Sequence, residues 1–123
     1  MKKIKRASMN LLLIQSDIQL NTSIAKFLEL KQINVTKVYD KTAAINHIDN
    51  KDFNLYIIDF NMNYFNGLDI IARIRRNFKE SLIIVITEYH SGHNIYEDNY
   101  TKLMTKPFYL EKLKTNIDEL LNS

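Results

Sequence analysis

The chain has 123 residues, of which 46% are hydrophobic and 25% charged, and its net charge is +3 at pH 7. This length and composition are typical of one soluble globular domain, and the absence of cysteine excludes disulfides and thiolate metal sites. No apolar run is long enough to cross a bilayer, and the basic start at 1–6 leads into a strand-like stretch rather than a cleavable signal segment. We therefore expect a cytoplasmic protein with a basic arm over 1–8 and one folded domain over 9–123.

The basic residues are spread along the chain, apart from the first six residues and the group Arg73, Arg75 and Arg76. A spread of this kind favours a solvated surface over a nucleic-acid footprint. We expect the three arginines to lie largely outward on a helix, with a docking patch for an acidic partner as the alternative.

The first half of the chain alternates between strand and helix periods. The run 9–14 is apolar except at Asn10, which predicts a strand buried on both faces, and 33–39 alternates as a second strand does. Asp17 and Asp40 can each cap a following helix. The apolar positions at helical spacing are Ile18, Ile24, Phe27 and Leu28 on the first helix and Ala43, Ala44, Ile45 and Ile48 on the second.

The second half repeats the alternation. Strands are predicted over 55–59, 82–87 and 102–105, and the segment between Glu88 and Asn99 has so few apolar anchors that any helix there is short or loosely packed. The inward stripes are Leu68, Ile70, Ile71, Ile74 and Phe78 on a helix opened by Gly67, and Leu110, Leu113, Ile117, Leu120 and Leu121 on a last helix. Five strand–helix units predict an α/β fold, a doubly wound parallel sheet with helices on both faces.

Three polar residues close three successive predicted strands. Asp59 ends the run 55–59, Thr87 ends the run 82–87, and Lys106 follows the run 102–105. Open parallel sheets bind their ligands at the carboxyl ends of the strands. We therefore expect these three side chains to converge on one crevice at that rim of the sheet.

The order of these residues is typical of one family. Asn61 and Met62 come just after Asp59, Gly67 follows, and the triplet Lys106-Pro107-Phe108 closes the set. With this pattern the chain resembles, over essentially its whole length, the receiver domain of two-component response regulators. The resemblance implies a five-stranded flavodoxin-like sheet of order 2-1-3-4-5.

The resemblance also implies a set of roles. Asp59 would accept a phosphoryl group from a histidine kinase or a phosphotransfer protein, forming an aspartyl phosphate. Lys106 and Thr87 would bind phosphoryl oxygens, and Mg²⁺ would be held by Asp59 and the backbone carbonyl of Asn61. Pro107 would follow a cis peptide bond that aims Lys106 into the pocket.

The first predicted strand ends differently from the family pattern. Gln15 and Ser16 stand where receivers usually carry two adjacent acidic residues that hold the metal, and Asp17 is better placed to cap a helix. Because hard cations bind according to the number of charged oxygen ligands, we expect weak or absent Mg²⁺ binding. Asp59 and Lys106 are then free to pair directly.

The switch residues also depart from the pattern. Leu103 stands in place of the aromatic that normally moves with Thr87, and Asn63 stands in place of the usual proline. The spacing from Thr87 to Lys106 is shorter than usual by about one helical turn. These departures indicate a degenerate receiver.

Several functions therefore remain open. The first is a phosphorylated signalling domain, not itself an enzyme, which binds nucleic acid only through an output domain absent from this chain. The second is a phosphorylation-independent module that binds a partner or a second copy through the fourth predicted helix, the strand 102–105 and the last helix.

Other ligand classes are disfavoured. The loop 15–23 lacks the glycine of a flavin phosphate site, and the chain has no tryptophan to stack on a flavin. His90 and His93 are too few to make a good transition-metal site, and His47 is expected at the surface.

Overall fold

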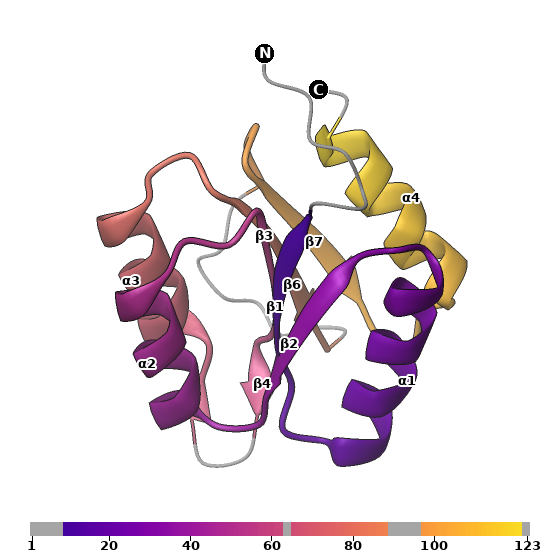
Figure 1. Ribbon diagram of the computed structural model, residues 1–123, viewed down its shortest axis with the longest axis horizontal. Coiled ribbons are helices and arrows are strands. Elements are labelled where there is room, and N and C mark those ends of the chain that lie inside the picture. The colour runs from indigo at the N-terminus through magenta and orange to yellow at the C-terminus, as the bar shows by residue number, and fades with distance from the viewer. Residues whose placement is uncertain (1–8, 63–64, 89–96, 122–123) are drawn as a thin grey trace.

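The computed structural model describes residues 9–62, 65–88 and 97–121 (Figure 1). Its main sheet has five strands: β1 (Asn10–Ile14), β2 (Asn34–Val38), β3 (Leu55–Asp59), β6 (Leu82–Thr87) and β7 (Thr101–Thr105). The order is β2-β1-β3-β6-β7 and every neighbouring pair is parallel. Counting these strands alone, this is the predicted order 2-1-3-4-5. The central strand β3 is buried along its whole length, because helices cover both faces of the sheet.

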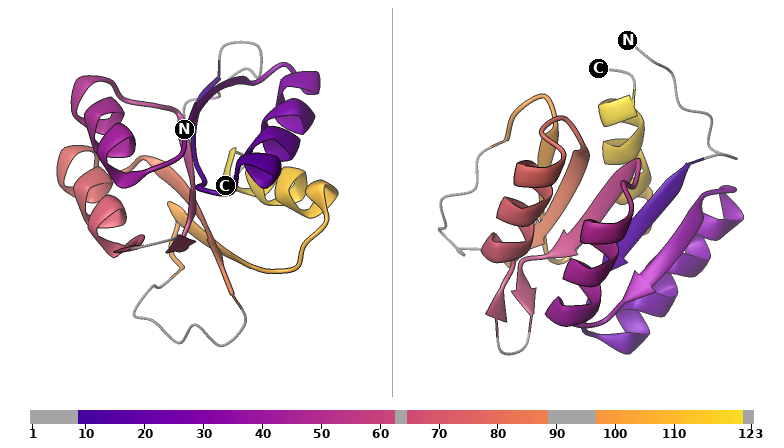
Figure 2. Two further views of the ribbon diagram at one scale, coloured as in Figure 1. Left: turned by 90° about the horizontal axis from the view of Figure 1, so that it is seen from below. Right: turned by 60° about the vertical axis from the view of Figure 1, so that its left-hand side comes forward.

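Four helices flank the sheet in the described part of the chain: α1 (Ile18–Leu30), α2 (Lys41–Asn50), α3 (Leu68–Asn77) and α4 (Leu110–Leu121). Figure 2 shows α1 and α4 on one face and α2 and α3 on the other. Each pair closes one core layer. Ile24 and Ile117 belong to the first layer, and Ile48 and Ile74 to the second. The predicted doubly wound architecture is confirmed.

Local sequence signals set the helix starts. The side chain of Asp17 accepts a hydrogen bond from Leu20 N, and that of Asp40 accepts one from Ala43 N, so both predicted caps are confirmed. Gly67 precedes α3 where the chain passes close to β3. A Cβ at this position would lie 3.3 Å from Phe60 Cα, so a side chain there would require the neighbouring groups to shift by a few tenths of an ångström.

Two elements differ from the sequence expectation. Residues Asn61–Met62 (β4) and Phe65–Asn66 (β5) form a short antiparallel hairpin directly after β3. The sequence did not predict this hairpin, because two-residue strands are too short to show an alternating pattern. Residues 89–96, which include most of the weak predicted helix and both His90 and His93, lie outside the described residues, as do Asn63 and the arm 1–8.

The predicted inward position of Leu68 is wrong, and Ile18, the first apolar position at helical spacing on α1, is also exposed. Ile18 is 67% exposed and Leu68 is 39% exposed, and each is the first residue of its helix. The rest of both stripes is sound, since Ile24 and Leu28 on α1 and Ile70 on α3 are fully buried.

Arg75 was expected to point outward, and this expectation is wrong. Its guanidinium donates to Ser81 O at 2.6 Å, to Tyr100 O at 3.1 Å and to Thr101 Oγ1 at 2.6 Å. The last turn of α3 lies beside the starts of β6 and β7, where carbonyl groups need donors, and partial burial there lowers the pKa of Arg75. Arg73 reaches Asp49 on α2 instead, and Arg76 is exposed.

His47 is half-buried rather than at the surface, with Nδ1 2.9 Å from Ala43 O of its own helix. In the described part of the chain, no helix has the length and apolar character needed to cross a membrane.

Candidate functional site

The Asp59 carboxylate lies at the carboxyl end of β3 and is 1% exposed. Its Oδ2 is 2.6 Å from Lys106 Nζ and accepts a hydrogen bond of 2.6 Å from Gln15 Nε2. Its Oδ1 accepts a bond of 3.0 Å from the backbone N–H of Asn61. One buried carboxylate is therefore held by a cation, an amide and a backbone donor. These three donors compensate the charge of the carboxylate and so offset the cost of burying it.

The strand order explains why these residues meet. Gln15 follows β1 and Lys106 follows β7, so both lie at the same rim as Asp59 because all strands of the sheet are parallel. The backbone N–H of Lys106 donates to Thr87 O at 2.8 Å, which joins the ends of β6 and β7. The peptide bond between Lys106 and Pro107 is cis, as the resemblance implied.

Thr87 occupies the same rim but a different face of the pleat. Its partner in register is Thr105, whereas the partner of Asp59 is Ile86, so the side chains of Thr87 and Asp59 start from opposite faces of the sheet. Thr87 is 8% exposed. The structure thus brings Asp59 and Lys106 into direct contact and places Thr87 beside them through its backbone carbonyl.

Gln15 is a site residue whose contacts sequence reasoning missed. It is 2% exposed, and besides donating to Asp59 it accepts a hydrogen bond of 2.9 Å at Oε1 from Asp17 N. Ser16 is half-buried, and the Asp17 carboxylate caps α1 rather than joining the site. The end of β1 therefore supplies an amide at the position where receivers usually carry an acidic residue.

Asn21 supports Gln15 and was also missed. It is fully buried on α1, and its Nδ2 donates to Gln15 O at 3.0 Å and to Val38 O at 3.3 Å. This side chain joins the carboxyl ends of β1 and β2. The available signal was its position on the apolar stripe, three residues before Ile24 and seven before Leu28.

Asn61 and Leu103 are two further residues that the sequence singled out. Asn61 Oδ1 accepts a hydrogen bond of 2.9 Å from Glu88 N and so connects the hairpin to the end of β6. Leu103, the residue at the expected aromatic position, is half-buried and packs against the α2–α3 layer. Its backbone N–H donates to Glu97 Oε2 at 3.0 Å.

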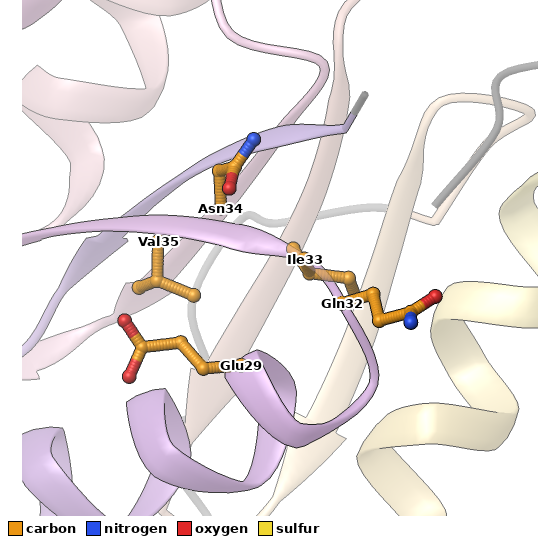
Figure 3. A pocket seen from close by; sticks show the side chains of 5 residues that line it. All are labelled: Glu29, Gln32, Ile33, Asn34 and Val35. Carbon is orange, nitrogen blue, oxygen red and sulfur yellow. The ribbon is translucent and has the colours of Figure 1, made fainter. Parts of the chain in front are cut away.

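Two of the hollows outside the Asp59 site are formed with α1 and α4. One, of about 470 Å³, runs along β7 and the start of α4, where Leu103, Phe108 and the 86% exposed Tyr109 line it. The other, of about 580 Å³, lies at the opposite rim between the end of α1 and the start of β2. Figure 3 shows its lining by Glu29, Gln32, Ile33, Asn34 and Val35. Among the described residues that line it, Glu29 is the one ionisable side chain, and these residues do not make up a catalytic site.

Comparisons with known proteins identify the family and the fold. The family model described as response regulator receiver domain matches residues 11–118. The chain is 27% identical over 117 residues to the transcriptional regulatory protein CiaR of Streptococcus pneumoniae, covering 90% of this chain and 50% of that protein. It is 28% identical over 118 residues to the response regulator protein PmrA of Pseudomonas aeruginosa, covering 91% and 52%. The chain thus spans about half the length of the curated relatives it matches.

Solved structures show the same fold. A response regulator receiver protein from Sinorhizobium medicae has a TM-score of 0.81 at 18% identity, covering 94% of this chain and 95% of that one. The response regulator TrrA of Thermotoga maritima, in complex with Mg²⁺–BeF, has a TM-score of 0.79 at 18% identity, covering 91% and 98%. The chain belongs to the response regulator receiver domain family of two-component signalling.

Proposed function

We propose that this receiver domain accepts a phosphoryl group on Asp59 from the phosphohistidine of a histidine kinase or a phosphotransfer protein. The supporting observation is the 2.6 Å contact between the Asp59 carboxylate and the Lys106 ammonium at the carboxyl rim of the sheet. A carboxylate is a nucleophile of the kind that forms aspartyl phosphates, and a fixed cation beside it compensates the incoming charge.

The proposed transfer moves the phosphoryl group from the donor histidine to Asp59. A bond forms between an Asp59 oxygen and phosphorus as the bond from phosphorus to the donor imidazole nitrogen breaks, and the imidazole leaves. Lys106 then exchanges its carboxylate partner for a phosphoryl oxygen, which a compact ammonium on a flexible stem can follow. Thr87, at the end of the neighbouring strand β6, is the second proposed reader of the phosphoryl group, and Leu103 is the proposed follower of its movement.

The residues around Asp59 do not fit a magnesium site well. Mg²⁺ requires oxygen ligands in near-octahedral geometry, usually with one or two carboxylates. Gln15 Nε2 and Lys106 Nζ both lie 2.6 Å from Asp59 Oδ2, where they present positive hydrogen atoms rather than lone pairs. The described residues contain no group of three or more His, Cys, Asp and Glu side chains arranged to bind a metal ion. We therefore propose weak or absent binding of Mg²⁺, including at the backbone carbonyl of Asn61.

Intact-mass measurement after incubation with acetyl phosphate, with and without MgCl₂, tests the proposed acceptor. We expect a population carrying one phosphoryl group, lost in Asp59→Asn and kept in Asp69→Asn, which removes an exposed carboxylate on α3. A wild-type chain that never gains this mass, from acetyl phosphate or from a phosphorylated histidine donor, would remove Asp59 as acceptor.

A phosphorylation-independent interaction module is the second candidate. The observation that favours it is that both carboxylate oxygens of Asp59 already have partners within the protein. In that case the hollow between β7 and α4, with the exposed Tyr109, would hold a partner or a second copy. The proposed contribution of the fourth predicted helix falls on residues outside the described part.

Binding assays with Asp59→Asn separate the two candidates. If the variant and the wild type bind the same partner or dimerise equally at all phosphodonor concentrations, the module is constitutive. We propose no nucleic-acid binding by the receiver fold itself. Such binding would depend on a separate output domain.

A further inference from the structure

We propose that Gln15 is a positioning residue that takes the place of a divalent cation: its carboxamide holds Asp59 against Lys106 and keeps metal ions out. The proposal deepens the function above and rests on Asp59 being the acceptor. It assigns metal independence to one side chain, which can be tested without any phosphoryl transfer.

The orientation of the Gln15 carboxamide is fixed by chemistry. A backbone N–H can only donate, so the group that lies 2.9 Å from Asp17 N must be the amide oxygen Oε1. The Nε2 group therefore faces Asp59 Oδ2, at 2.6 Å. Turning the amide over would set donor against donor at Asp17 and oxygen against oxygen at Asp59, which would break both hydrogen bonds.

The backbone of Gln15 is held as firmly as its side chain. Its N–H donates to Val38 O at 3.1 Å, and its carbonyl accepts from Asn21 Nδ2 at 3.0 Å. Because Gln15 is 2% exposed, neither end of the residue has room to rearrange into water. A metal ion approaching Asp59 from β1 would therefore meet a fixed N–H donor.

The charge count points the same way. Asp59 and Lys106 are neutral as a pair, and a neutral amide adds nothing to attract a divalent cation. A carboxylate at position 15 would reverse this, because two carboxylates at hydrogen-bond distance repel unless a proton or a cation lies between them. Gln15→Glu changes one group and keeps the length of the side chain, so it isolates the effect.

Thermal unfolding with and without millimolar MgCl₂ tests the proposal. We expect the Tm of the wild type not to respond to MgCl₂. Gln15→Glu should lose roughly 5 °C without metal and regain it saturably as MgCl₂ is added, since a ligand that binds only the folded state stabilises it. Gln19→Glu makes the same change at an exposed position of α1 and should behave as the wild type.

Gln15→Met provides a second measurement if Gln15→Glu fails to fold. It removes the amide without adding charge, so we expect a lower Tm and no response to MgCl₂. A saturable increase of the wild-type Tm with MgCl₂, or a Gln15→Met variant as stable as the wild type, would overturn the role of Gln15. Neither result would alter the mass test of Asp59, so the two proposals can fail separately.

Discussion

The β1 side and the β7 side of the Asp59 site are built from different chemistry. On the β1 side, Gln15 and Asn21 are neutral amides, 2% and 0% exposed, bound to each other through the Gln15 carbonyl. On the β7 side, Lys106 brings a positive charge to the carboxylate, and 29% of its side chain is exposed. The proposed phosphoryl-binding cation, Lys106, and the position that carries metal-binding acids in the family, occupied here by Gln15, therefore lie on different sides of Asp59.

Burial also differs between the two sides. The β1 side is closed by hydrogen bonds from Asn21 to the ends of β1 and β2, whereas two other partners of Asp59, Lys106 and Asn61, are partly exposed. An incoming phosphodonor would therefore approach Asp59 from the side of Lys106 and Asn61. Changes on the β7 side should affect chemistry and stability together, and changes at Asn21 should affect mainly stability.

Lys106→Met is expected to have the largest effect. Among the described residues, it leaves the 1% exposed carboxylate with the neutral donors of Gln15 and Asn61. Removing one partner of a fully buried ion pair costs about 3–5 kcal/mol, and with Lys106 partly exposed we expect about 2–3 kcal/mol from denaturant unfolding. The rate of phosphoryl acceptance should fall by about 100-fold in the mass assay.

A matched variant and a double variant control this prediction. Lys102→Met removes a lysine of β7 that pairs with the surface residue Glu119, so its cost should stay below about 1 kcal/mol. The double variant Asp59→Asn/Lys106→Met should lose less free energy of unfolding than the two single variants together, since it leaves no unpaired carboxylate buried at position 59. Additive costs would mean that the 2.6 Å pair contributes no coupling.

Much of this architecture could be predicted from the sequence. Strands with two buried faces read as continuous apolar runs, as in 55–59 and 82–87, and Asp17 and Asp40 are caps because their carboxylates accept backbone N–H groups just after them. The pairing of Asp59 with Lys106 follows from two opposite charges at one rim of a parallel sheet.

The remaining features depend on three-dimensional neighbours. The sequence shows an amide in place of an acid at position 15. That this amide donates to Asp59 depends on its orientation, which is set by the hydrogen bond from Asp17 N to Gln15 Oε1. Arg75 points inward because carbonyl groups at two strand starts converge beside α3, and no local period records that. Such polar contacts join residues far apart in the chain, so hydrophobic periodicity cannot show them.

Asn21→Ala is expected to have the next largest effect. It removes the donor shared by Gln15 O and Val38 O and leaves a small cavity beside the ends of β1 and β2. The loss should be about 2 kcal/mol in denaturant unfolding. Phosphoryl acceptance at Asp59 should change much less than in Lys106→Met, because Lys106 still contacts the carboxylate.

Asn46→Ala is the control for this change. Asn46 is exposed on α2, and its replacement should alter stability by no more than about 0.5 kcal/mol. If Asn21→Ala were as mild as Asn46→Ala, the amide side of the site would not be held by Asn21, and the contrast between the two sides would weaken.

The smallest expected effect is the dependence of Tm on pH, which distinguishes the surface ion pairs from the buried pair of Asp59 and Lys106. Hydrogen bonds from Arg73, Lys41 and Lys102 lower the pKa of Asp49, Asp69 and Glu119, respectively, below ordinary values of 3.8, 3.8 and 4.5. A carboxyl group with a lowered pKa in the folded state stabilises the fold above its ordinary pKa, and this contribution is lost as the pH falls through the folded value. Below about pH 4, the Tm of the wild type should therefore approach that of Asp69→Asn, which has already lost its pair with Lys41.

Salt makes the same distinction at neutral pH. The Asp69 and Lys41 side chains are 71% and 37% exposed, so high salt should screen their attraction and narrow the Tm gap between the wild type and Asp69→Asn. The gap for Lys106→Met should survive the same salt, because the Asp59 side chain is 1% exposed and ions cannot approach it closely. A gap for Lys106→Met that closed in salt would place Asp59 in water, and the amide side could not then hold it as proposed.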